Sequence, residues 1–412
     1  MLYINPFLGR FDFWTGERGR QFVVELTRRG ATVETLSAIL GQGASEAARP
    51  TGLLAWAKRA LREKIAIDRA MFLVELLLIA RGMRRTMRQT WQVWRRRAEL
   101  PVDAVLARAF EYDWTAWIVG RILKVPVVLE SHSVFFIERR LRGRRFSAVW
   151  RWFEIRQWRN CDRIWVNTPE LKQKIVENGI AADRVVVIPF GLKLEAYSAA
   201  PHQHDDDDVD LIFVGSFYTW HGAEVLLRAL AVARGRTDKV RRLVMVGDGM
   251  TRSNCEDLAR ELNVADIVEF TGWLPHDQVV ARIHDADIAV APYLKVEPFY
   301  FEPVKVLEYM AEGAAVVSSN QGCVSELLDD GAIGRLVPPG DVEALAREIV
   351  DLAEDPAARA RLGRAGRAKF ERHHTMQTTA ARVFTVLADL TRAAAPQDEL
   401  HSTAQLGARP ET

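Results

Sequence analysis

The sequence predicts an α/β protein of two domains, each built on a doubly wound parallel sheet. Short apolar strands alternate with helices through both halves of the chain, which is the pattern of such sheets. At 412 residues the chain is long enough for two of them. Residues 196–210 between the halves are polar and contain four consecutive aspartates, Asp205, Asp206, Asp207 and Asp208. A charge run in this place is typical of a solvated linker rather than a metal site.

Composition limits the setting of the protein. The hydrophobic fraction of 49% and the charged fraction of 27% are ordinary for a globular chain. Three cysteines, Cys161, Cys255 and Cys323, lack the spacing of a metal site and indicate a reducing compartment. No apolar run reaches the roughly 20 residues of a membrane helix, and no basic segment of a signal peptide precedes the strand at residues 1–5. We therefore expect a cytoplasmic protein.

The first half begins with a βαβ unit. A strand at residues 1–5 leads through a loop to a helix at 17–29, and a second strand follows at 31–36. Gly9 and Gly16 flank the loop, and ligands in open α/β sheets bind at such loops. A plain turn is the alternative. The later elements expected in this half are strands at residues 102–107, 125–130, 162–167 and 185–189, and helices at 114–123 and 169–178.

Residues 51–100 form a strongly basic helical segment. Twelve basic residues stand against four acidic ones, a net charge of +8, and Trp56, Trp91 and Trp94 are interspersed among them. A basic helix with tryptophans is typical of a surface that binds anionic membranes. A helical hairpin with a solvated basic face is the alternative. The segment carries no nucleic-acid recognition motif, so we expect no nucleic-acid partner.

A histidine follows the strand predicted at residues 125–130. His132 stands in the sequence Glu130-Ser131-His132-Ser133, where the carboxyl end of a parallel strand faces the ligand crevice. A loop histidine with an ordinary structural role is the alternative. Next comes an arginine block, which we expect to form either a mobile loop over an anionic acceptor or a solvated face: Arg139, Arg140, Arg142, Arg144 and Arg145.

The second half repeats the alternation of strands and helices after residue 210. Its first strand, at residues 211–214, is followed by a turn at Gly215 and then a helix, a geometry that brings backbone amides to a phosphate. The strand at 243–246 ends in a turn at Gly247, Asp248 and Gly249. Further strands are expected at 267–270, 288–291, 314–318 and 334–338, and helices at 341–353 and 356–373, with a disordered polar tail at 395–412.

A helix at residues 303–312 is the centre of this half. Pro303 at its first position and Gly313 just past its end are typical boundaries of a helix. Lys305 and Glu308 are three residues apart and share one face. The free amides of Val304 and Lys305, with the lysine charge, would hold a phosphate, and the carboxylate of Glu308 could hold ribose hydroxyls. An ordinary amphipathic helix is the alternative.

This stretch, with its Pro-x-Lys-x-x-Glu-Tyr-Met form from Pro303 to Met310, resembles the donor-binding helix of the retaining glycosyltransferases of family 4. That family has the GT-B fold, in which two Rossmann-like domains face a central cleft. The resemblance covers nearly the whole chain. It implies the following division: an N-terminal acceptor-binding domain at residues 1–195 with the basic insertion at 51–100, a linker at 196–210, a C-terminal nucleotide-sugar-binding domain at 211–375, and a helix at 376–394 that crosses back to the first domain.

The resemblance also implies roles on the donor side. Of the two glutamates of the family's Glu-x(7)-Glu pattern, the second binds the nucleotide ribose and matches Glu308. The first contacts the donor sugar and falls on Tyr300, so that Tyr300, Glu302 and Glu297 are all candidates for its role. Ser216 and His221 take the places of the usual Arg and Lys that hold the diphosphate beside Gly215.

Two further loops are implied on the same side. The turn at Gly247 and Asp248 is typical of the family, and the loop with Trp273 and Leu274 lines the nucleobase pocket in family members. Trp273 as a core residue is the alternative. On the acceptor side, the resemblance points to the loop at Gly9 and Gly16.

The implied chemistry needs charge stabilisation more than a strong base. His132 would lie against the donor sugar and the acceptor, and Lys305 would stabilise the diphosphate as it leaves. The acceptor hydroxyl attacks from the face that the diphosphate leaves, and a phosphate oxygen takes its proton. We therefore expect no protein nucleophile, no metal and no other cofactor.

The expected function is transfer of a sugar from a nucleoside-diphosphate donor to a glycan or a polyprenyl-diphosphate-linked acceptor. Bacterial surface-polysaccharide synthesis is the expected setting, in the cytoplasm or peripherally on the inner face of the cell membrane. The alternatives are a sugar-nucleotide epimerase of the same fold, and a non-catalytic carbohydrate-binding or membrane-surface protein. The sequence names neither the donor sugar and its base nor the acceptor.

Overall fold

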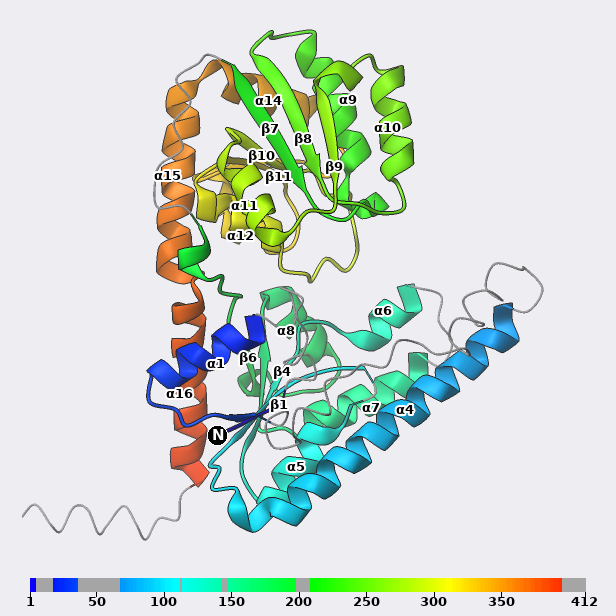
Figure 1. Cartoon of the computed structure of the whole chain (residues 1–412), viewed down its shortest axis with the longest axis vertical. Helices are drawn as coiled ribbons and strands as arrows, with labels where there is room; N and C mark the ends of the chain where they lie inside the picture. The colour runs from blue at the N-terminus through cyan, green and yellow to red at the C-terminus, as the bar shows by residue number, and fades with distance from the viewer. Residues whose placement is uncertain (5–17, 36–66, 112, 142–146, 198–207, 395–412) are drawn as a thin grey trace, which may run out of the picture. The chain divides into compact units, whose positions relative to one another are not determined.

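The computed structural model describes residues 1–4, 18–35, 67–111, 113–141, 147–197 and 208–394. The chain forms two compact units (Figure 1). The first contains the described parts of Met1–Asn167, Leu171–Ile188 and the chain from Ala380 onward, and the second contains Thr168–Glu170 and the described parts of Pro189–Thr379. Each unit has a parallel sheet and helices, so the predicted fold class is confirmed.

The first unit contains a six-stranded parallel sheet in the order β2-β1-β3-β4-β5-β6. The order reverses between β1 and β3, which makes the carboxyl ends of these strands the expected ligand edge. The strand predicted from residue 102 begins only at Val105, because the amide of Val102 is bonded back to the carbonyl of Leu100 at 2.9 Å. The strands are β1 (Leu2–Ile4), β2 (Glu34–Thr35), β3 (Val105–Arg108), β4 (Val127–Glu130), β5 (Arg163–Val166) and β6 (Val185–Val187).

The helices of the first unit include one long basic helix, α4 (Ile67–Arg96), with a 3₁₀ turn at Arg97–Glu99. This confirms a helix in the basic segment over residues 67–96, while residues 51–66 lie outside the described residues. None of the helices in the described ranges has the length and apolar character that crossing a bilayer requires. The others are α1 (Arg18–Arg28), α5 (Thr115–Leu123), α6 (Phe135–Leu141), α7 (Ser147–Arg159), α8 (Pro169–Glu177) and α16 (Met376–Ala394). Of these, α8 belongs to this unit from Leu171 on and α16 from Ala380 on.

The arginine block after His132 differs from the prediction. Arg139 lies in α6, and its side chain is 1% exposed rather than solvated or in a loop. Its guanidinium lies 3.6 Å from the carboxylate of Glu111 and 5.0 Å from the centroid of the Trp150 ring. A carboxylate and an aromatic face compensate the buried charge, which explains why this arginine turns inward. Arg142, Arg144 and Arg145 lie outside the described residues.

The second unit has a six-stranded parallel sheet in the order β12-β11-β10-β7-β8-β9. β7 begins at Val209, inside the stretch expected to be linker, because Asp210 is buried and bonded by Arg241 and Arg242 at 2.8–2.9 Å. Asp205, Asp206 and Asp207 lie outside the described residues. The strands are β7 (Val209–Val214), β8 (Val240–Val246), β9 (Val268–Gly272), β10 (Ile288–Ala291), β11 (Ala315–Ser319) and β12 (Arg335–Val337).

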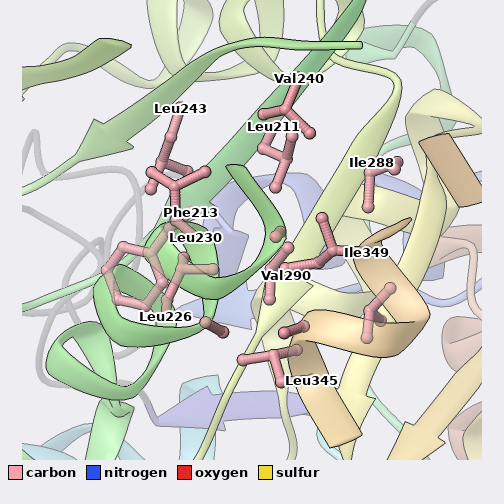
Figure 2. Packing of buried hydrophobic residues seen from close by; sticks show 14 of the residues in the cluster. Leu211, Phe213, Leu226, Leu230, Val240, Leu243, Ile288, Val290, Leu345 and Ile349 are labelled. Carbon is pink, nitrogen blue, oxygen red and sulfur yellow. The ribbon is translucent and has the colours of Figure 1, made fainter. Parts of the chain in front are cut away.

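Helices cover both faces of this sheet. Alternate residues of a strand point to opposite faces and therefore pack into two separate apolar clusters. Leu211 and Phe213 of β7 belong to one apolar cluster, and Ile212 between them belongs to another. Figure 2 shows the first cluster, in which these side chains meet Leu226 and Leu230 of α9 and Leu345 and Ile349 of α14. The helices are α9 (Ala223–Arg234), α10 (Arg252–Glu261), α11 (His276–His284), α12 (Val304–Glu312), α13 (Val324–Leu327), α14 (Val342–Glu354) and α15 (Pro356–His373).

Local chemistry sets the boundaries of these helices. Asp341 and Asp355 cap α14 and α15, their carboxylates accepting from the amides of Ala344 and Ala358 at 2.9 and 2.8 Å. Gly313 ends α12 with a φ of 74°, as its place in the sequence predicted. Pro303 is the N-cap rather than the first helical residue, so the helix begins one residue later than predicted, at Val304.

Candidate functional site

The strand order of the second unit reverses between β7 and β10, so a ligand is expected at the carboxyl ends of these two strands. The loop at residues 215–222 follows β7, and residues 292–303 connect β10 to α12. Both segments therefore start at the same edge of the sheet. Most of the predicted donor-side residues lie in these segments or on α12, so the topology brings them together.

Lys305, in the first turn of α12, is 9% exposed. Its Nζ lies 4.5 Å from the centroid of the Phe213 ring and 5.2 Å from that of Tyr293. No described residue gives this nitrogen a hydrogen-bond partner. Burial lowers the pKa of Lys305 to about 7, against the opposing charge of Glu308. A buried ammonium without an acceptor is costly, so this position favours an anionic ligand.

The loop after β7 is shaped around this lysine. A Cβ atom at Gly215 would lie 2.5 Å from Nζ of Lys305, and Gly215 has a φ of 152°. Glycine is therefore required where the loop passes the lysine. The side chain of Ser216, by contrast, is exposed, and no described contact holds it beside Lys305.

His221 closes the same loop but brings no charge to it. Its Nδ1 lies 2.5 Å from the carbonyl oxygen of Ser216, so Nδ1 carries the proton of the neutral ring. Burial and the neighbouring charge of Lys305 lower the pKa of His221 to about 3. The imidazole is therefore neutral near pH 7, and Lys305 is the only one of these two groups that titrates there.

The start of α12 differs from the prediction in one respect. The amide of Val304, expected to be free for a phosphate, donates to the carbonyl of Glu302 at 2.9 Å. The tight turn before the helix uses this donor because Pro303 has no amide hydrogen of its own to give. The expectation of a free Val304 amide is therefore wrong, whereas Nζ of Lys305 has no hydrogen-bond partner among the described residues.

Glu308 is 2% exposed and is held by a residue that the sequence did not point to. Nε2 of His276, the first residue of α11, lies 2.9 Å from Oε1 of Glu308. The hydroxyl of Tyr197 lies 3.5 Å from the same oxygen, at the limit of a hydrogen bond. Eight residues along α11, Nδ1 of His284 lies 2.9 Å from Oε2 of Glu312, so two histidine–glutamate pairs join α11 to α12.

The three candidates for the donor-sugar contact lie in different environments. The carboxylate of Glu302 accepts from the amide of Phe190, with both oxygens at 3.0 Å. Tyr300 is fully buried, and its carbonyl accepts the hydroxyl of Thr168 at 2.8 Å. The side chain of Glu297 is exposed and paired with Lys295 at 3.1 Å.

The two remaining donor-side loops lie at the same edge. The amide of Gly247 donates to the carbonyl of Gly272 at 2.9 Å, and the amide of Phe217 donates to that of Asp248 at 3.0 Å, so the loops after β7, β8 and β9 are joined. Trp273 is 77% exposed, so the alternative that placed it in the core is wrong. Leu274, by contrast, packs against the apolar cluster around α12.

The candidate catalytic histidine lies in the first unit. His132 follows β4, as predicted, and its Nε2 is hydrogen-bonded to Oε1 of Glu130, a buried residue at the end of that strand. The imidazole and the Trp165 ring form a T-shaped pair, with centroids 5.8 Å apart. This carboxylate fixes the ring, a contact that the sequence analysis did not identify. Gly9 and Gly16 lie outside the described residues.

Two family models match consecutive parts of this chain. The model described as Glycosyltransferase Family 4 matches residues 20–196, and that described as Glycosyl transferases group 1 matches residues 198–369. The chain belongs to glycosyltransferase family 4.

Similar curated proteins carry related names. Glycogen synthase of Mycobacterium tuberculosis (strain CDC 1551 / Oshkosh) is 29% identical over 58% of this chain and 56% of its own length. The amylovoran biosynthesis glycosyltransferase AmsK of Erwinia amylovora is 24% identical over 51% of this chain and 50% of its own. The chain thus spans about half the length of these curated relatives.

Solved structures confirm the GT-B fold expected of a family 4 member. HepE of Anabaena, in complex with UDP, has a TM-score of 0.62 at 20% identity. The match covers 73% of this chain and 82% of the HepE chain. A glycosyltransferase from Rickettsia africae ESF-5 has a TM-score of 0.62 at 14% identity and covers 94% and 97%.

Two positioning contacts lay beyond the family resemblance. Only the fold brings His276 close to Glu308, 32 residues further along the chain. Glu130 precedes His132 by two residues, and this spacing was the available sequence signal for their contact. Among the described residues, no group of three or more His, Cys, Asp or Glu side chains could hold a metal ion.

Proposed function

We propose that this chain is a retaining glycosyltransferase that moves a sugar from a nucleoside-diphosphate donor to a hydroxyl of a glycan or lipid-linked acceptor. The observation that carries the proposal is Lys305, a buried ammonium without an acceptor at the point where the strand order reverses. Glu308 lies one helical turn further, with His276 on one of its oxygens. A diphosphate at the lysine and a ribose at the glutamate fit this spacing.

The proposed reaction exchanges one glycosidic bond for another. The bond from the anomeric carbon of the donor to the diphosphate breaks, and a bond from the same carbon to the acceptor oxygen forms on the same face. The departing phosphate oxygen takes the proton of the acceptor hydroxyl, and the nucleoside diphosphate leaves. Lys305 stabilises the negative charge that develops on this oxygen, a contribution of ~3–4 kcal/mol for one well-placed donor.

The comparisons support the donor and the setting without fixing either. HepE was crystallised with UDP and with UDP-glucose, which favours a nucleotide sugar as donor. The name of AmsK refers to amylovoran biosynthesis, which favours assembly of a bacterial polysaccharide. We propose His132 as the residue that lies against the donor sugar and acceptor, because Glu130 holds its ring at the ligand edge of the first sheet.

We also propose that the reaction needs no metal. The charge of the leaving diphosphate is met by Lys305 and by backbone donors of the glycine loop. Activity should therefore survive an excess of EDTA. Loss of turnover that manganese or magnesium restores would overturn this part of the proposal.

A thermal-shift screen against nucleotide sugars tests the donor site. A donor at about 100 times its dissociation constant should add about 2.7 kcal/mol to the free energy of unfolding. Lys305→Met and Glu308→Ala should each abolish most of this shift. Lys239→Met is the matched control, because Lys239 precedes β8 at the opposite edge of the sheet and pairs with Glu354 at 3.2 Å. No shift with any donor would contradict the proposal.

Product analysis separates transfer from the alternatives. Consumption of the donor should depend on an acceptor and release a nucleoside diphosphate. Conversion to another nucleotide sugar without acceptor would indicate an epimerase. Donor binding without any turnover would indicate a carbohydrate-binding protein. We propose a peripheral location at the inner face of the cell membrane, where a lipid-linked acceptor would be found.

A further inference from the structure

Helix α4 exposes a continuous row of apolar side chains. Met87, Trp91 and Trp94 are 60%, 54% and 50% exposed, which is unusual for such large apolar groups. They belong to a set spaced three or four residues apart, which we call the apolar stripe: Leu76, Ala80, Met83, Met87, Trp91 and Trp94, all exposed. This is the spacing of one helical face, and residues 76–94 extend for roughly 27 Å along the axis.

A row of arginines runs beside the apolar stripe. The arginine row consists of Arg81, Arg84, Arg88 and Arg95, all exposed. With about 100° of turn per residue, these positions follow the stripe around the helix on one side. The guanidinium of Arg95 lies 4.8 Å from the centroid of the Trp91 ring, and that of Arg97 lies 4.7 Å from that of Trp94. The guanidinium groups of Arg95 and Arg97 therefore lie directly beside the tryptophan rings at this end of the helix.

A third side of α4, next to the apolar stripe and opposite the arginine row, is docked against its unit. Thr86, Thr90 and Val93 are buried. The amide of Trp114 donates to the Thr86 hydroxyl at 3.4 Å, the Thr115 hydroxyl donates to the Gln89 side chain at 3.0 Å, and Arg85 pairs with Asp113 at 3.2 Å. These contacts hold α4 against the start of α5.

We propose that this face of α4 lies in the plane of an anionic membrane, with the apolar stripe in the headgroup–acyl boundary and the arginine row on the lipid phosphates. A helix with an apolar face, tryptophans and an adjacent basic row matches such a surface in both polarity and charge. The proposal names the residues for the peripheral location given above. It is independent of the transfer reaction, because its readout is lipid binding.

Vesicle co-sedimentation of the full chain tests the proposal. Equimolar phosphatidylglycerol and phosphatidylcholine vesicles should bind the protein at about 0.1 M salt, where the screening length is about 10 Å, and release most of it at about 1 M, where it is about 3 Å. Vesicles of phosphatidylcholine alone should bind little. Tryptophan fluorescence should shift to the blue on binding, and a Trp91→Phe, Trp94→Phe variant should lose most of that shift.

Two variants divide the surface. A row variant with Arg84→Gln, Arg88→Gln and Arg95→Gln should bind on the order of 100-fold more weakly, at about fivefold per arginine. A stripe variant with Met87→Ser, Trp91→Ser and Trp94→Ser should lose the binding that persists at high salt. The matched control removes three exposed arginines from the second unit: Arg347→Gln, Arg361→Gln and Arg364→Gln. It should bind as the wild type does.

The donor-induced thermal shift should be unchanged in all these variants, which separates this test from that of the enzyme and confirms that they fold. Equal recovery in the supernatant with both lipids would overturn the proposal. So would an equal loss of binding in the control variant. Light scattering that shows a dimer, lost in the stripe variant and accompanied by no vesicle binding, would assign the stripe to a second copy of the chain and overturn it as well.

Discussion

Binding of a nucleoside diphosphate should take up protons, because the side chains of Lys305 and His221 carry little positive charge above pH 7 in the ligand-free protein. Burial lowers the pKa of Lys305 to about 7 and that of His221 to about 3. A bound diphosphate places negative charge beside both groups and raises both pKa values. Between the free and the bound pKa of Lys305, each binding event therefore adds a proton to the site.

The magnitude follows from the lysine alone. At pH 8, one unit above the pKa of about 7 in the free protein, about 0.9 proton should enter per nucleotide bound. The affinity should fall about fivefold from pH 7 to pH 8 and about ninefold from pH 8 to pH 9. The diphosphate itself contributes little in this window, because its last ionisation has a pKa of about 6. A lysine of ordinary pKa would produce almost no slope here.

Isothermal titration calorimetry at pH 8 in Tris and in HEPES measures the proton count directly. The observed enthalpy should differ between the buffers in proportion to the difference of their ionisation enthalpies. Lys305→Arg is the informative variant, because its guanidinium stays charged at this pH. It should remove most of the buffer dependence while keeping part of the affinity.

Equal enthalpies in the two buffers, together with an affinity that is flat from pH 7 to pH 9, would refute this reasoning. Such a result would mean either that Lys305 is already charged in the empty site or that the diphosphate binds elsewhere. Lys305→Met distinguishes these cases. If Lys305→Met and wild type bind equally, the lysine is not at the diphosphate. If Lys305→Met binds much more weakly, the lysine is at the diphosphate and already charged in the ligand-free protein.

Three further predictions concern single side chains. Lys305→Met should stabilise the ligand-free protein at pH 7 by about 2–4 kcal/mol, since it removes a buried ammonium, and denaturant unfolding would show this as a higher midpoint. His276→Phe should weaken nucleotide binding by at most about 1.5–3 kcal/mol by releasing Glu308, with kcat retained at saturating donor and affinity recovered in His276→Gln. Burial raises the pKa of Glu154 to about 8. Stability from this carboxyl is thus present below pH 4.5 and lost as pH rises through 8, so Glu154→Gln should flatten the dependence of the unfolding midpoint on pH over that range.

The sequence was most informative where function and local structure share the same signal. Pro303 and Gly313 delimited the central helix to within one position, and the spacing of Lys305 and Glu308 placed both on one face of it. Alternation of strands and helices was enough to predict two parallel sheets. These features depend on residues close together in the chain, which is why they could be read without the fold.

Other features depend on partners that are distant in sequence. Arg139 was expected in a mobile loop or on a solvated face, and its burial is explained only by the nearby Glu111 and Trp150. Trp273 could have been core by composition, yet the loop that carries it leaves it exposed. The charge state of His221 was equally hidden, because it depends on burial and on the nearby Lys305.

The two histidine–glutamate pairs between α11 and α12 bear on how nucleotide choice could change during divergence of such a chain. If the nucleotide binds as proposed, the base is met by the loop that runs into α11 and the ribose by α12. The pairs His276–Glu308 and His284–Glu312 fasten these helices at two points, so that the spacing between base and ribose contacts is a property of the helix pair. A change at His284 or Glu312, remote from the ligand, would then retune that spacing. A search for specificity determinants that stops at ligand-contacting positions would overlook both residues.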